Sequence, residues 1–410
     1  MTAPSRAVGL LVALVALASL AAGLVLGARE SDKRAAGGLA SPAGGVAGPT
    51  SFLERIVPAR HARERTPRGP GAPRSVRDLA RRLPLERKVA QLFLLGFEGN
   101  DTSAAIFPRL RRFDLGGIVV VRENYVDPGQ LATMGGEARK VADAAGHVAP
   151  WVLTAQDGAE FNWLPGLPPT EAPADLENAG AATAQATEAA TTLRGLNVTG
   201  VLDPVVDVGS ASGSPLGARI YSDEPDEVSG YADAVVRAFR DKRLFSAAKH
   251  FPGLGGADQL TEVGPASVGL SLNALRQRDL LPFRAAIEAG VPAIMVSSGL
   301  YAMNNFTRPA SLTRSIVTGL LRDELGFAGV AITDDLADPA ISTSYSVPDA
   351  AVMALQAGAD MVFVSGSAGD QQAAYTAVLR AVQRGRLSRA RLDEAVLRDL
   401  RAKWDYGLIR

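Results

Sequence analysis

From about residue 76 onward, short apolar runs alternate with segments of helical periodicity. Each run is rich in branched or aromatic residues and lacks a polar face, which is typical of parallel strands buried on both sides. Eight such runs occur, at residues 89–97, 116–121, 150–156, 198–208, 244–251, 292–298, 329–335 and 359–365.

The segments between these runs show apolar residues at three- and four-residue spacing, as in amphipathic helices. Residues 226–242 and 311–326 show this pattern, and the second segment is expected to begin at a Ser311 cap and end at Gly326. Eight strand–helix units in residues 76–410 predict a single α/β domain, a (β/α)₈ TIM-type barrel. A doubly wound open sheet is the alternative, but it usually has fewer strands.

The pattern before the barrel is different. Residues 7–28 form an uncharged apolar run after Arg6, long enough to span a bilayer. We expect residues 1–28 to be a signal peptide or a membrane anchor, so that the chain is extracytoplasmic, either membrane-anchored or secreted. Residues 29–75 are rich in Gly, Pro, Ala and Arg and predict a disordered linker. A solvated tether is the preferred interpretation of its basic charge, over attraction to anionic lipid or wall polymer.

The amino-acid composition narrows the range of partners and catalytic groups that the chain can have. Lys and Arg total 43 and so do Asp and Glu, so net charge does not favour a nucleic-acid partner. The absence of cysteine excludes disulfides and a cysteine nucleophile. With only three histidines, His61, His147 and His250, a multi-histidine metal centre is not expected.

Polar residues follow the predicted strands, and barrel active sites lie at the C-terminal ends of the strands. Lys249 and His250 together at one strand end are difficult to explain as capping residues. The full set at these ends is Arg122, Asp157, Asp207, Lys249, His250, Ser298, Asp334 and Asp335.

Asp334 and Asp335 lie in "LLRDELGFAGVAITDDLA", residues 320–337, directly after a predicted strand. A carboxylate at this position can attack an anomeric carbon or act as a base. Capping of the next helix is the structural alternative, with Asp335 as the candidate cap.

Five motifs in order resemble the N-terminal barrel of glycoside hydrolase family 3, as in single-domain bacterial β-N-acetylhexosaminidases. The resemblance covers residues 76–410. The motifs are residues 320–337, "KHFPG" at 249–253, "PVVDV" at 204–208, "PASLT" at 309–313 and "ALQAGADMV" at 354–362.

This resemblance implies that Asp334 is the nucleophile of a retaining glycosidase. It also implies that Lys249, His250 and Arg219 contact the sugar, and it implies neither a cofactor nor a metal. The implied substrate carries a terminal β-linked sugar, N-acetylglucosamine first, with peptidoglycan fragments among the candidate glycans.

The chain departs from the family in the site itself. Glu262 stands where the family has the histidine of its Asp-His acid/base pair. Ala155 and Trp163 replace a sugar-binding aspartate and an arginine, and Asp157 is expected to take over a hydroxyl contact. Ser298, where a histidine is common, is a further candidate for substrate binding.

These departures leave three interpretations. In the first, Glu262, or less favourably Asp258, is a general acid whose pKa is raised by apolar neighbours such as Leu260 and Val263. In the second, the barrel is a tethered glycan-binding module without catalysis. In the third, it binds phosphate near residues 365–370 and uses Lys249 as a Schiff-base lysine.

Overall fold

The computed structural model describes residues 71–210, 213–304 and 306–410, so the expected signal or anchor segment lies outside the described residues. In the described part, eight parallel strands form a closed barrel, in which β8 pairs with β1. Closure rules out the doubly wound alternative. The strands are β1 (Phe93–Leu95), β2 (Gly117–Val119), β3 (Trp151–Thr154), β4 (Gly200–Val201), β5 (Phe245–Phe251), β6 (Ala293–Val296), β7 (Val330–Asp335) and β8 (Met361–Val364).

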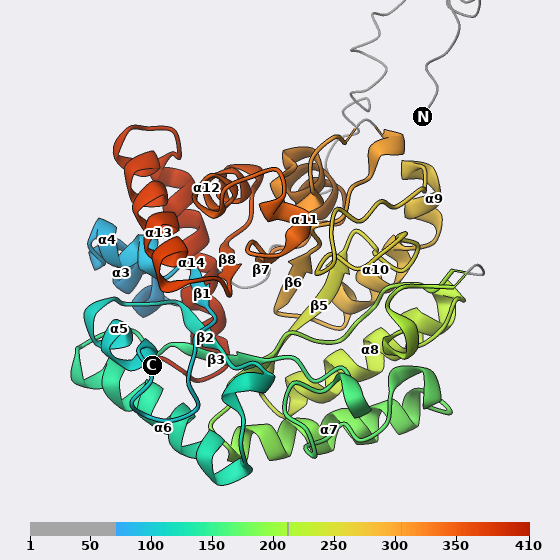
Figure 1. The fold of residues 1–410 in the computed structure, drawn as a ribbon, viewed down its shortest axis with the longest axis horizontal. Helices are drawn as coiled ribbons and strands as arrows, with labels where there is room; N and C mark the ends of the chain where they lie inside the picture. Colours follow the sequence, from blue (N-terminus) through green and yellow to red (C-terminus); the bar gives the residue numbers. More distant parts are fainter. Residues whose placement is uncertain (1–70, 211–212, 305) are drawn as a thin grey trace, which may run out of the picture. The chain divides into compact units, whose positions relative to one another are not determined.

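Each strand lies within one of the eight predicted apolar runs, and all strands are buried except for the partly exposed Asp334 of β7. Helices surround the barrel (Figure 1). None of the helices in the described ranges has the length and hydropathy needed to cross a bilayer. The helices are α3 (Arg74–Arg82), α4 (Leu85–Ala90), α5 (Ile106–Arg112), α6 (Pro128–Ala144), α7 (Ala179–Gly195), α8 (Pro225–Asp241), α9 (Leu272–Gln277), α10 (Leu280–Glu288), α11 (Pro339–Ser342), α12 (Val347–Ala357), α13 (Ala368–Gln383) and α14 (Arg389–Asp405).

The helix predicted at residues 226–242 is confirmed as α8, which buries Val228, Val235 and Phe239 on one face. The start predicted for the helix at 311–326 is wrong. Regular helix begins at Ser315 and runs to Glu324 as a π-helix (η8), with the Leu325 N–H bonded to the Leu320 carbonyl at 3.0 Å.

Ser311 does not cap this helix because its backbone is held elsewhere. It lies in a 3₁₀ turn, η7 (Ala310–Leu312), and its N–H donates to the carbonyl of Ser297 after β6 at 3.0 Å. The predicted end is confirmed, since Gly326 follows the helix in the left-handed region at φ +71°.

The barrel interior is packed at the end where the strands begin. The rings of Trp151 and Phe245 stack 4.2 Å apart, and Tyr406 packs edge-on against both. The Trp151 indole N–H donates to Asp399 of α14 at 2.7 Å. Helix α14 and the residues after it therefore pack across this end of the barrel interior, and the largest of the described cavities lies toward the C-terminal ends of the strands.

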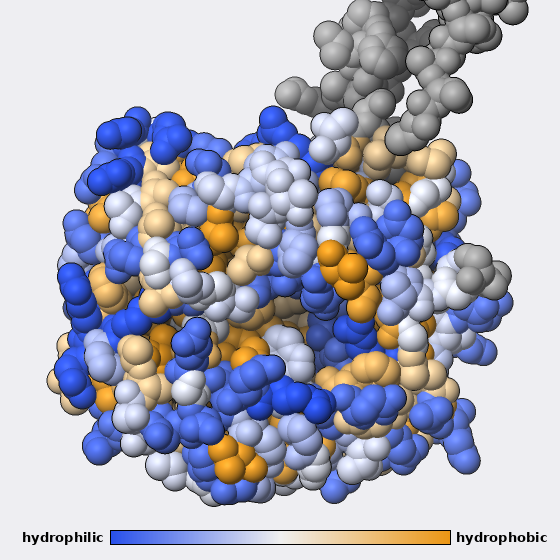
Figure 2. Space-filling view, viewed as in Figure 1, coloured by the Kyte–Doolittle hydropathy of each residue, from blue (hydrophilic) through white to orange (hydrophobic). Residues whose placement is uncertain are grey.

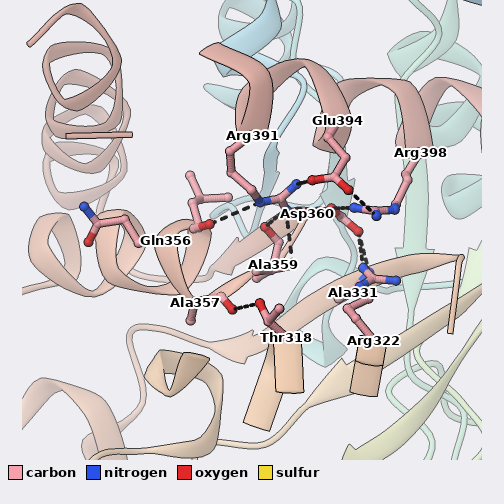
Figure 3. Close-up of polar contacts among 12 residues, drawn as sticks. Thr318, Arg322, Ala331, Gln356, Ala357, Ala359, Asp360, Arg391, Glu394 and Arg398 are labelled. Atoms are coloured by element: carbon pink, nitrogen blue, oxygen red, sulfur yellow. Dashed lines mark hydrogen bonds and ion pairs between the residues drawn. The ribbon is translucent and has the colours of Figure 1, made fainter. Parts of the chain in front are cut away.

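A buried charge network ties two outer elements, η8 (Ser315–Glu324) and α14, to the barrel (Figure 3). Asp360, directly before β8, is fully buried. It forms ion pairs with Arg322 of η8 at 2.5 Å, Arg391 of α14 at 2.7 Å and Arg398 of α14 at 3.0 Å. Burial alone would raise the pKa of Asp360, but these three guanidinium groups lower it.

Candidate active site

A cavity of about 600 Å³ opens at the C-terminal ends of the strands. Figure 2 shows a hollow near the centre of this face, bordered by both hydrophilic and hydrophobic residues. Leu202, Met295 and Phe363 supply apolar surface in the cavity. Six of the side chains predicted for the site line it: Asp157, Arg219, Lys249, His250, Glu262 and Asp334.

One side of the cavity carries an array of paired charges, formed by two cations and two carboxylates. The Lys249 ammonium lies 2.7 Å from Asp157 and 3.3 Å from Asp203, and Arg219 lies 3.9 Å from Asp157. Asp157 thus joins the two cations, which places Lys249 and Arg219, two of the three residues that the resemblance implies contact the sugar, side by side.

The charge state of this array follows from its pairing. Burial alone would raise the pKa of Asp157, but Lys249 and Arg219 hold it at about 2. Burial opposes the charge on Lys249, but Asp157 and Asp203 raise the pKa of the ammonium above its ordinary value. A lysine held as ammonium is a hydrogen-bond donor and a poor nucleophile, which counts against the Schiff-base interpretation.

His250 is fixed by a carboxylate that the sequence placed at the end of the fourth run. Asp207 accepts the Nδ1–H of His250 at 2.7 Å and the His250 backbone N–H at 3.1 Å. The other oxygen of Asp207 accepts the Leu254 N–H at 2.6 Å. The histidine therefore keeps one orientation and lines the cavity, and no residue of the described part of the chain hydrogen-bonds its Nε2. The start of the loop after β5 is held as well.

Asp334 lies at the end of β7, partly exposed in the cavity. Burial raises the pKa of Asp334 to about 6; the nearby His250 lowers it and Glu262 raises it. Above that pH the group is a carboxylate, as a nucleophile requires.

The sequence offered capping of the next helix as the structural alternative for Asp335, but its carboxylate makes other hydrogen bonds. Its Oδ1 accepts the N–H groups of Ala337 at 2.9 Å and Ser365 at 3.0 Å. Asp335 therefore braces the turn after β7 against the end of β8. Of the two aspartates, Asp334 has its carboxylate available to the cavity.

Glu262 enters the cavity from the β5–α9 loop (residues 252–271). The prediction that apolar neighbours surround the Glu262 carboxyl is wrong. Glu262 is exposed, Val263 beside it is 68% exposed, and the nearest hydrogen-bond partner of the carboxylate is the Thr261 hydroxyl at 3.3 Å. Solvent therefore reaches this carboxylate, while Leu260 packs inward against the core.

The β5–α9 loop is fixed at two other points. Asp258 accepts the Ser267 N–H at 2.7 Å and is not among the cavity-lining residues, so it organises the loop. Gly255 passes so close to the segment that follows β4 that a Cβ atom there would lie 2.0 Å from the Val208 carbonyl oxygen. Only glycine fits this approach.

Ser298, like Asp258, is a predicted site residue that does not line the cavity. It is fully buried, and its hydroxyl has no hydrogen-bond partner in the described part of the chain. Ala155 and Trp163 do line the cavity, so the two replaced positions face the site.

The sequence reasoning missed Asp338, a further carboxylate in the cavity lining. Asp338 lies one residue beyond the motif at 320–337, so the match of that motif to the family did not include it. The feature of the sequence that could have identified Asp338 was a third aspartate within five residues of a strand end.

For residues 71–410, apart from the gaps at 211–212 and 305, no group of three or more His, Asp or Glu side chains has an arrangement suited to a metal ion. The carboxylates that line the cavity are Asp157 after β3, Glu262 in the β5–α9 loop, and Asp334, Asp335 and Asp338 at and after the end of β7. A closed parallel barrel with such a cavity at the strand ends defines a (β/α)₈ enzyme-type site.

The chain belongs to glycosyl hydrolase family 3. Residues 84–402 match the family described as "Glycosyl hydrolase family 3 N terminal domain". The resemblance drawn from the five motifs is confirmed, and the chain is a glycosyl hydrolase by family.

Relatives support the same assignment. A β-hexosaminidase of Xanthomonas oryzae pv. oryzae is 30% identical over 286 residues, covering 67% of this chain and 83% of the relative. An uncharacterised secreted glycosyl hydrolase of Arthroderma benhamiae is 28% identical over 323 residues, covering 76% and 91%. A family 3 β-N-acetylglucosaminidase from Paenibacillus superposes with a TM-score of 0.77 at 32% identity. The match covers 80% of this chain and 63% of that longer one.

Proposed function

We propose that this protein hydrolyses terminal β-linked sugars, N-acetylglucosamine first, with retention of configuration. The observation that carries the proposal is the position of Asp334 at the end of β7, in the same cavity as His250, Glu262 and the Lys249–Asp157–Arg219 array. The names of the Xanthomonas and Paenibacillus relatives support the choice of sugar.

In the first step, the Asp334 carboxylate attacks C1 of the sugar, the C1–O bond to the leaving group breaks, and a general acid protonates the leaving oxygen. Glu262 is the acid that the sequence predicts. In the second step, water attacks C1 and gives a proton to the same acid/base group, and the bond from C1 to Asp334 breaks. Lys249 and Arg219 donate hydrogen bonds to sugar hydroxyls, His250 forms a hydrogen bond with a sugar hydroxyl through Nε2, and together they orient C1 toward Asp334.

We propose further that the protein acts outside the cytoplasm, on wall-derived or other glycans, as a secreted or N-terminally anchored enzyme. The apolar run at residues 7–28 and the secreted Arthroderma relative support this location.

The test is the intact mass of the full chain after incubation with activated 2-fluoro and 5-fluoro β-glycosides of several sugars. These reagents carry good leaving groups, so they require the nucleophile but not the acid. We expect a covalent adduct that maps to Asp334 and is absent in Asp334→Asn. The sugar that labels fastest identifies the substrate.

The replaced polar contacts at Ala155 and Trp163 favour one other function, a glycan-binding module without turnover. Binding of wall fragments with no adduct from any fluoro sugar would support that alternative and overturn catalysis by Asp334.

A further inference from the structure

Asp338 stands at the cap position of helix α11, four residues after Asp334. Its N–H donates to the Asp335 carbonyl at 3.3 Å, which closes a tight turn directly after β7. Aspartate at a cap position ordinarily accepts a helix N–H. The Asp338 carboxyl makes no such bond, and it lines the cavity. Its oxygens are therefore available to a ligand.

The turn that carries Asp338 is joined to the segment that carries Glu262. The Ala340 N–H donates to the Thr261 carbonyl at 3.1 Å. Thr261 directly precedes Glu262, the position at which the acid/base histidine of the hexosaminidases is missing. Two carboxyl groups from two different loops thus converge beside Asp334.

The surroundings of Asp338 favour its neutral form. The charged groups that act on it are Asp334 and Asp335 of β7 and Glu262 of the β5–α9 loop. Burial, followed by the charges of these three carboxylates, raises the pKa of Asp338 to about 9. Within the described ranges, no Lys or Arg side chain pairs with it. Glu262, in contrast, is exposed to solvent.

We propose that Asp338 is the general acid/base of this site and replaces the missing Asp-His pair. This inference rests on the proposed glycosidase function. The Asp338 carboxyl gives its proton to the glycosidic oxygen as the C1–O bond breaks and Asp334 bonds to C1. Esterification removes the negative charge of Asp334, so the new Asp338 carboxylate is no longer opposed by it. That carboxylate then takes a proton from the attacking water, and the Asp334 ester is released.

The experiment compares Asp338→Asn, Glu262→Gln and wild type on two N-acetyl-β-glucosaminides. One is an unactivated disaccharide, and the other is the 2,4-dinitrophenyl glycoside, whose leaving group needs no proton. For Asp338→Asn we expect kcat/KM on the disaccharide to fall about 10²- to 10⁴-fold. On the dinitrophenyl glycoside, kcat/KM should stay within about tenfold of wild type, because the first step there does not use the acid.

Azide supplies a readout that a structural role would not change. With Asp338→Asn and the dinitrophenyl glycoside, the second step lacks its base, so kcat should fall. Azide attacks C1 without needing a base and should restore turnover, with the β-glycosyl azide as product. The alkaline fall in the wild-type pH profile should also disappear in Asp338→Asn.

Folding is checked separately. Asp338→Asn removes a carboxyl whose ionisation is disfavoured in the folded chain, so its thermal midpoint at pH 8 should be equal to or above that of wild type. Asp349→Asn is the matched control: it removes an aspartate near the start of the next helix, outside the cavity lining, and should retain wild-type rates.

Three results would overturn the inference. Full disaccharide activity in Asp338→Asn is one. Azide rescue found in Glu262→Gln and not in Asp338→Asn is another, and it would assign the acid to Glu262. A wild-type protein with no turnover and no Asp334 adduct would remove the proposed function and this inference together. Normal fluoro-sugar labelling of Asp334 separates the first two results from the third.

Discussion

Asp334 shares its side of the cavity with Glu262, Asp335 and Asp338, and faces His250. Its surroundings act on the pKa of Asp334 in opposite directions. Burial and the charge of Glu262 favour the neutral acid, whereas the charge of His250 favours the carboxylate. A nucleophile in such a position is ionised only over part of the pH range. The titration of Asp334 is therefore the property on which the residue-scale chemistry depends.

We expect the rate of fluoro-sugar labelling to fall about tenfold per pH unit below about pH 6, because labelling requires the carboxylate and burial raises the pKa of Asp334 to about 6. The rate is measured by intact mass from pH 4.5 to pH 8. In Glu262→Gln the midpoint should move to lower pH, since one opposing charge is removed. A labelling rate that is flat down to pH 4.5 would show that Asp334 has an ordinary carboxyl pKa.

Among the elements, the β5–α9 loop has the most influence on the site, because it carries Glu262 and contacts the turn of Asp338. Asp207, Asp258 and the Ala340–Thr261 hydrogen bond each hold part of it. Its closest approach to the barrel is at Gly255, against the Val208 carbonyl. The loop can occupy its place only while that contact is free of a side chain.

Gly255→Ala should displace the loop, since its Cβ would lie 2.0 Å from a backbone oxygen. We expect a loss of about 1–3 kcal/mol in the free energy of unfolding, as for other overpacked sites. The kcat/KM of the disaccharide should fall as well. Gly256→Ala is the control, because the nearest atom to its Cβ is a Leu270 methyl carbon at 3.8 Å. Equal behaviour of the two variants in denaturant unfolding and kinetics would contradict this account.

At the scale of the whole molecule, the two ends of the barrel have separate roles. The closed end holds stacked aromatic rings and the Asp360 network of Figure 3, which links η8 and α14 to β8. The open end holds the cavity. Stability and chemistry are thus separated along the barrel axis, as is usual for this fold.

Asp360→Asn should cost about 3–5 kcal/mol in the free energy of unfolding, because it leaves three guanidinium groups around a buried position without their anion. Denaturant unfolding at pH 7 measures the loss. Because the folded pKa of Asp360 is lowered, its contribution is present above the unfolded carboxyl pKa and is lost as pH falls through the folded value. Asp393→Asn removes an exposed ion pair with Lys88 and should cost less than about 1 kcal/mol. Similar costs for the two variants would contradict the role of the network.

Much of this protein follows from local sequence. Continuous apolar runs give strands buried on both faces, and eight of them separated by helices give a closed barrel whose strand ends face one cavity. That reasoning located Asp157, Lys249, His250 and Asp334 together. It failed at Ser298, which follows β6 yet points into the packed interior.

The sequence by itself determined the strands, their order, the family and the nucleophile candidate, because these depend on periodicity and on contiguous motifs. The exposure of Glu262, the use of Asp258 within its loop and the position of Asp338 were decided only by the tertiary structure. Burial and charge at a residue depend on groups brought from distant parts of the chain. Asp338 faces Glu262 because residues 261 and 340 are joined by one hydrogen bond, a contact that no local pattern records.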